Sequence, residues 1–144
     1  MIAIEREPVR KLAFGDQTVQ GLPFYGGNVE YHVPVLLSQD AVIRVEASRF
    51  RNPLLKAQID DGKAEVIAYS PYQAQLSCPA GEHTLHLTAF GNRRNTFGTI
   101  HNCNDMETWY GPDTWRTTDR EWAYEYQLRS IGILKTPIVE SREA

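Results

Sequence analysis

Residues 83–90 read HTLHLTAF, and apolar and polar side chains alternate along this stretch. In an extended chain Leu85, Leu87 and Ala89 point to one face, whereas His86 points to the other. A period of two residues is the signature of a strand that is buried on one side only. The stretch therefore predicts one half-buried strand of a β-sheet.

Two other stretches have the same period. Residues 41–48, AVIRVEAS, alternate apolar and charged side chains. Residues 121–128, EWAYEYQL, alternate most regularly, and their large apolar side chains share one face: Trp122, Tyr124, Tyr126 and Leu128. β-branched and aromatic side chains are also the ones that strands prefer. We expect both stretches to be strands, with Trp122 in the core.

Turn signals separate these stretches at short intervals. In IDDGKAEVIAY, residues 59–69, an Asp-Gly pair between two apolar runs predicts a β-hairpin. SPY at residues 70–72 and CPAGEH at residues 78–83 indicate two more turns, and NVEYHVPV at residues 28–35 predicts another strand. Many short strands without a long amphipathic helix predict an all-β fold. We expect an antiparallel β-sandwich of the jelly-roll type.

Composition limits the classes of partner. The chain of 144 residues has the size of one domain and a net charge of −3. Proteins that bind nucleic acids or membrane surfaces usually carry an excess of basic residues, so neither partner is expected. No apolar run approaches the roughly 18 residues of a membrane-spanning helix, and the first residues lack a secretory pattern. We expect a soluble protein, in a compartment that the sequence leaves open, with Cys78 and Cys103 as free thiols.

The candidates for metal binding and catalysis form no complete set. His83 and His86 are three residues apart in a predicted strand, so they point to opposite faces and cannot chelate one metal ion. His101 and Cys103 lack the second Cys/His pair that a zinc site needs. The sequence contains no nucleophile elbow and no glycine-rich phosphate loop. We therefore expect no catalytic residue and no cofactor in this chain.

The polar stretch FGNRRNTFGTIHNCND, residues 90–105, follows the first of these predicted strands. Its glycines and asparagines tolerate turn conformations and bind their own backbone, so we expect a long ordered loop at one end of the sandwich. Arg93 and Arg94 are candidates for ion pairs that stiffen this loop. Together with Asn95 and His101, they are also candidates for contacts with a sugar.

A second loop is rich in aromatic residues. The stretch ETWYGPDTWRTTDREW, residues 107–122, carries Trp109, Tyr110 and Trp115 with Asp113 interleaved. Aromatic rings stack on the apolar face of a pyranose, while polar groups bind its hydroxyls. This pattern predicts a sugar-binding surface, and its alternative is packing against a neighbouring domain.

Three stretches, taken in their order, resemble a β-sandwich module of large bacterial glycoside hydrolases: GLPFYGGNVEYHVPV, IDDGKAEVIAYSPYQAQLSCPAGEHTLHLTAFGNRRNTFG and WAYEYQLRSIGILKTPIV. The module is the galactose-binding-like jelly roll of beta-galactosidase-like family 2 enzymes and alpha-L-rhamnosidase-like enzymes. Its closing pattern, Tyr-x-Leu-x-x-x-Gly-Leu-Leu-x-x-Pro, is matched by Tyr126, Leu128, Gly132, Ile133, Leu134 and Pro137. The resemblance covers about residues 19–139.

The resemblance implies that catalysis takes place in a separate domain. Enzymes of that kind keep their catalytic carboxylates in a separate barrel, and such a barrel needs about 250 residues. We therefore expect an accessory domain that is not an enzyme by itself. Its expected parts are a linker or N-terminal extension at residues 1–18, the sandwich at 19–139 and a loose tail at 140–144.

Two functions of different classes follow. The first is a non-catalytic accessory domain of a glycoside hydrolase that binds carbohydrate or docks onto the catalytic domain. The second is a small standalone enzyme, of the lyase or epimerase type, that uses His101 with Asp105 or Glu107. Sandwiches of this type commonly hold a structural calcium ion. The sequence does not locate the oxygen ligands of such an ion in this chain.

Overall fold

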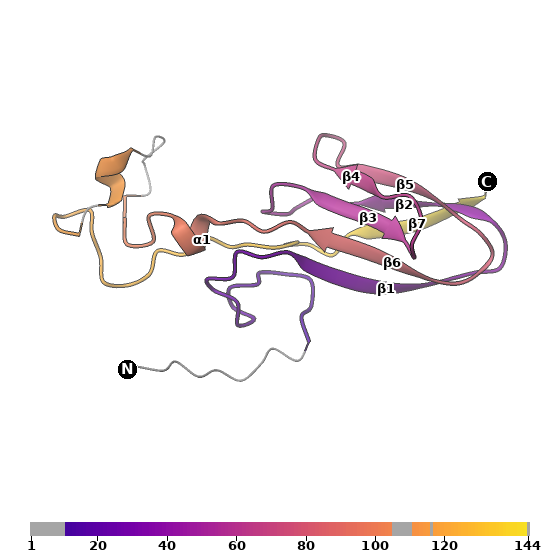
Figure 1. Cartoon of the computed structure of the whole chain (residues 1–144), viewed down its shortest axis with the longest axis horizontal. Helices are drawn as coiled ribbons and strands as arrows, with labels where there is room; N and C mark the ends of the chain where they lie inside the picture. The colour runs from indigo at the N-terminus through magenta and orange to yellow at the C-terminus, as the bar shows by residue number, and fades with distance from the viewer. Residues whose placement is uncertain (1–10, 105–110, 116, 144) are drawn as a thin grey trace.

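Two antiparallel β-sheets pack face to face in the computed structural model, which describes residues 11–104, 111–115 and 117–143 (Figure 1). The first sheet has the order β1-β6-β3-β4, with β1 (Val29–Leu37), β6 (Gly81–Ala89), β3 (Leu55–Ile59) and β4 (Glu65–Ile67). The second has the order β5-β2-β7, with β5 (Gln73–Cys78), β2 (Ala41–Glu46) and β7 (Ile138–Glu143). The expected all-β sandwich is confirmed.

The core lies between the two sheets and follows from the alternating stretches. Ile43 and Val45 of β2 and Leu85 and Leu87 of β6 are almost completely buried in one cluster. Their polar neighbours along each strand point away from this cluster, which confirms the strands predicted at 41–48 and 83–90. Burying each such side chain stabilises the fold by roughly 1.5–3 kcal/mol before entropic costs. The period-2 pattern is therefore what holds the sheets together.

The predicted hairpin at 59–69 is formed by β3 and β4, which pair in antiparallel register. Asp60 adopts a left-handed conformation (φ 44°), and the Gly62 amide donates to the Ile59 carbonyl at 2.9 Å. Asp tolerates this region better than most residues because its short side chain can bond locally. The Asp-Gly signal thus identified both the turn and the two strands.

Both ends of the sandwich differ from the expected domain limits. The Gly15 amide donates to the Ile133 carbonyl at 2.7 Å, and the Gln17 amide donates to the Ile131 carbonyl at 2.9 Å. Gln17 is itself buried, so residues before position 19 belong to the packed body. At the other end, β7 pairs with β2 as far as Glu143, so residues 140–143 form a strand and not a loose tail.

Beyond β6 the chain leaves the sandwich, extends past the end of both sheets and returns to β7 (Figure 1). We call residues 91–130 the arm. Its described residues include the short helix α1 (Arg94–Phe97) and the 3-10 helix η1 (Pro112–Trp115). Among the described ranges, no helix combines the length and the apolar character needed to cross a membrane.

The prediction of a strand at residues 121–128 is wrong. Among the described residues of this region, the only strand-like pairing is an isolated bridge from Asn102 to Trp122, and the rest of the stretch is irregular. Tyr124 is 83% exposed and Tyr126 is 55% exposed, although alternation predicted them to face the core. The physical reason is that this stretch lies on the arm, beyond the two sheets. There, within the part of the chain that the structure describes, no strand pairs along its length and no second sheet covers its apolar face.

Candidate functional site

Asn95 anchors the base of the arm. Its side-chain amide donates to the Arg129 carbonyl at 2.8 Å, and its side-chain oxygen accepts from the Arg129 amide at 3.0 Å. The side chain is fully buried and bridges the outgoing and returning chains of the arm. Asn95, a sequence candidate for sugar binding, is therefore closed to a ligand in solution and has a structural role.

Other side chains fix the beginning of the arm to the body. The Gly91 amide donates to Asn28 Oδ1 at 2.9 Å, and Asn92 donates to the Arg51 carbonyl at 3.0 Å. A Cβ atom at Gly91 would lie 2.0 Å from the Gly26 carbonyl oxygen, so only glycine fits this close approach. These contacts fix the start of the asparagine- and glycine-rich segment to the body.

Five rings form a continuous row that begins in the N-terminal segment and continues onto the arm: Phe24, Tyr126, His101, Trp122 and Tyr124. We call this set the aromatic row. The centroids of successive rings are 4.9, 5.0, 5.6 and 4.4 Å apart. These separations are those of favourable edge-to-face and offset-stacked aromatic pairs. The tyrosines and the tryptophan that alternation assigned to the core thus form a surface feature.

His101 occupies the centre of the aromatic row. Its Nδ1 lies 2.9 Å from the Ala123 carbonyl oxygen, which can only accept, so Nδ1 carries the proton and donates. The Ala123 amide in turn donates to the His101 carbonyl at 2.9 Å, so the two chains of the arm are fixed to each other here. Nε2 remains as an acceptor. Asp105 and Glu107, the carboxylates expected beside His101, lie outside the described residues.

The remaining sequence candidates are spread along the arm. Trp115, at the end of η1, is 54% exposed, and Asp113 in the same helix is also exposed. Asp113 lines a small depression beside Trp122, which connects η1 to the aromatic row. Arg93 and Arg94 lie at the start of α1, in a different part of the arm. Trp109 and Tyr110 lie outside the described residues.

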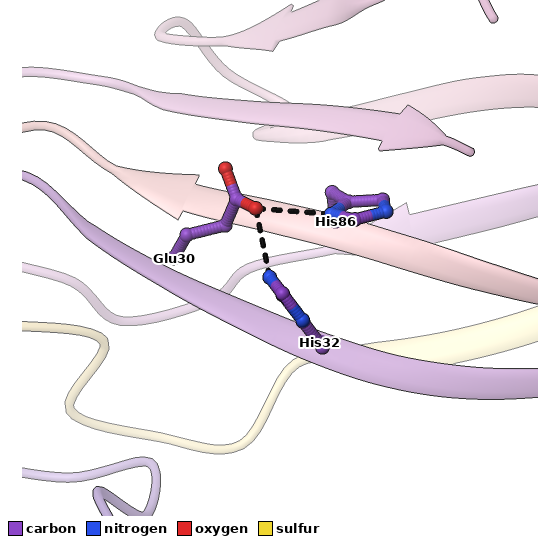
Figure 2. Close-up of side chains that lie close together, drawn as sticks. All are labelled: Glu30, His32 and His86. Carbon is purple, nitrogen blue, oxygen red and sulfur yellow. Dashed lines mark hydrogen bonds and ion pairs between the residues drawn. The ribbon is translucent and has the colours of Figure 1, made fainter. Parts of the chain in front are cut away.

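A polar cluster that the sequence analysis did not predict lies on the outer face of the first sheet (Figure 2). Glu30 Oε1 lies 2.8 Å from His32 Nε2 and 3.0 Å from His86 Nδ1, and Glu30 Oε2 accepts from Thr88 Oγ1 at 3.1 Å. The hydrogen bonds from His86, His32 and Thr88 outweigh partial burial and lower the pKa of Glu30 to about 2. We call Glu30, His32 and His86 the His–Glu cluster.

The register of two strands creates this cluster. His32 of β1 and His86 of β6 are direct cross-strand partners, and their ring centroids are 4.7 Å apart. Glu30 precedes His32 by two residues, so it shares the same face of β1. A Glu-x-His pair in a predicted strand was visible in the sequence, but its partner His86 is defined only by the pairing of β1 with β6.

A groove of about 770 Å³ runs beside β1, at the edge of the first sheet. The N-terminal segment forms one wall, where Phe14 stacks on Tyr31 with ring centroids 4.5 Å apart. Glu30 and His32 also line this groove. The His–Glu cluster is therefore reached both from solvent above the sheet and from the groove at its edge.

His83 belongs to a different site from His86. Its Nδ1 lies 2.6 Å from Asp60 Oδ2, and this hydrogen bond raises the pKa of His83 and lowers that of Asp60. The backbone amide of Thr84 also donates to Asp60 at 2.8 Å and further lowers the Asp60 pKa. His83 and His86 thus have separate partners, as their odd spacing in one strand predicted.

In comparisons with known proteins, the chain matches no family model, no curated protein and no solved structure.

Proposed function

We propose that the chain is a non-catalytic binding module that uses the aromatic row to hold a carbohydrate. The observation that carries this proposal is the continuity of the row, with five rings in contact and Tyr124 and Tyr126 open to solvent. A jelly-roll accessory domain of a glycoside hydrolase, which the sequence resembles, is the context we propose for it.

The chemistry of the row favours a sugar. The apolar face of a pyranose stacks on exposed rings, and Tyr and His add polar atoms at the ring edge for its hydroxyls. His101 Nε2 is an acceptor within the row, because Nδ1 is engaged by Ala123. Asp113, beside Trp122, adds a carboxylate that accepts from hydroxyl groups.

Docking onto a catalytic domain is the second candidate function. Exposed aromatic side chains are enriched at protein interfaces, and the described residues of the arm include Phe97 and Trp115, which are exposed outside the row. The length of the arm beyond the sandwich also suits an interdomain contact (Figure 1). This reading predicts an apolar contact surface without affinity for free sugars.

A glycan-array screen of the purified chain tests the proposal. We expect binding to a defined sugar that is lost in Tyr126→Ala and in Tyr124→Ala, because each removes a stacking surface. Trp115→Ala shows whether η1 contributes to the same site. Tyr69→Ala is the matched control, since Tyr69 is about as exposed as Tyr124 but lies on the sandwich outside the row. Sugar binding that survives both row variants would show that the aromatic row is not the sugar site. A folded chain that binds no sugar would favour docking.

A further inference from the structure

The His–Glu cluster has the geometry of a pre-assembled ligand set. His32 Nε2 and His86 Nδ1 both point at one atom, Glu30 Oε1, at 2.8 and 3.0 Å (Figure 2). Each of the three side chains offers a ligand atom, and these atoms lie within 4.8 Å of one another. Ligand atoms around a tetrahedral zinc ion are about 3.4 Å apart, given bonds of about 2.0–2.2 Å. Small side-chain adjustments therefore close the set around an ion.

The scaffold holds these ligands in place. The two histidines come from adjacent strands at directly paired positions, and Glu30 is two residues from His32 on the same face. Thr88 donates to Glu30 Oε2 at 3.1 Å, which leaves Oε1 directed between the two imidazole rings. Carboxylates that bind metal ions in proteins usually accept such hydrogen bonds, which hold them in place. The paired strands therefore hold these three side chains in place before any metal ion binds.

The donor atoms select the class of ion. Two imidazole nitrogens and one carboxylate oxygen suit first-row divalent transition ions, whereas Ca²⁺ and Mg²⁺ prefer oxygen ligands alone. His32 is 63% exposed, so solvent reaches the side of the cluster that faces away from the sheet. Three protein ligands with an open fourth position are an established zinc arrangement.

We propose that Glu30, His32 and His86 form a binding site for one divalent transition-metal ion, Zn²⁺ in the first instance, on the outer face of the β1–β6 pair. The open coordination position faces solvent and takes water or a small anionic or nitrogen ligand. The ion cross-links edge strand β1 to β6 beside the groove. This site is separate from the aromatic row and does not depend on sugar binding.

The test is a calorimetric titration of the chain with Zn²⁺ in a Cys103→Ser background, because Cys103 is an exposed thiol that could bind zinc by itself. We expect one ion per chain. His32→Ala and His86→Ala each remove a ligand. Each should weaken binding by more than the roughly 10- to 100-fold that is lost when a hydrogen-bond partner of a ligand is removed. Thr88→Val should fall within that roughly 10- to 100-fold range.

His83→Ala is the matched control, since it removes a histidine of the same strand whose partner is Asp60, outside the cluster, and it should leave zinc affinity unchanged. The imidazole NMR signals give a second readout that needs no substitution. Of the four histidines, only those of the cluster should shift on Zn²⁺ addition, and His83 and His101 should not. Saturable zinc binding that survives both cluster substitutions, shifts confined to His83 or His101, or no zinc binding at all would overturn the proposal.

Discussion

The sandwich body and the arm are stabilised by different interactions. In the body, paired strands bury an apolar core, and Leu55, Leu85 and Ile133 have no exposed surface. In the arm, individual polar contacts such as Asn95 with Arg129 and His101 with Ala123 hold two irregular segments together. Apolar burial is cooperative across the whole core, whereas these polar contacts are local. The arm can therefore expose its aromatic rings because its shape does not depend on burying them.

The largest effect should come from the body. Leu85→Ala should lower the free energy of unfolding by about 2–5 kcal/mol, because it leaves a cavity in a core that cannot fully collapse. Urea denaturation followed by circular dichroism measures this loss. Leu36→Ala is the control, since Leu36 is a largely exposed leucine of the first sheet and should change stability by no more than about 0.5 kcal/mol. Equal effects of the two variants would contradict the assignment of the core.

A smaller effect should come from the base of the arm. Asn95→Ala removes two hydrogen bonds and leaves the Arg129 backbone groups without these partners, so we expect a loss of about 1–3 kcal/mol. Limited proteolysis should show faster cleavage within the arm while the body stays resistant. Thr117→Ala, at an exposed arm position, should leave both readouts unchanged. Uniformly faster cleavage of body and arm would mean that the two regions are not separable.

The smallest effect should be a change of stability with pH at the Asp60–His83 pair. The pKa of His83 is raised above 6.5 in the folded protein, so its contribution is complete below pH 6.5 and is lost as the pH rises through the folded value. The pKa of Asp60 is lowered below 3.8, so its contribution is complete above pH 3.8 and is lost as the pH falls through the folded value. The pair therefore stabilises the body most between these limits.

Thermal unfolding of the wild type and of Asp60→Asn, compared below and well above pH 6.5, measures this effect. Asparagine keeps an oxygen that can accept from the Thr84 amide but removes the charge, so the wild type should lose more stability than the variant as the pH rises. Parallel pH profiles for the two proteins would show that the pair contributes nothing to the body.

How far the sequence predicted the functional surfaces depends on how local each signal is. The polar segment at the base of the arm was recognised as an ordered loop, because asparagine and glycine act on their own backbone. Of the aromatic row, His101 was a candidate for sugar contact, whereas Trp122, Tyr124 and Tyr126 were placed on one face of a predicted strand. The His–Glu cluster was missed because Glu30 and His86 are 56 residues apart.

The sequence by itself determined the strands predicted at residues 41–48 and 83–90 and their buried faces, since alternation acts over a few positions and needs no knowledge of the rest of the chain. It determined the hairpin at Asp60 for the same reason. Only the tertiary structure decided which alternating stretch had a neighbour: residues 83–90 pair on both sides, whereas residues 121–128 lie beyond the sheets. It also decided the register that sets His32 opposite His86, because strand pairing is fixed by packing across the whole sandwich.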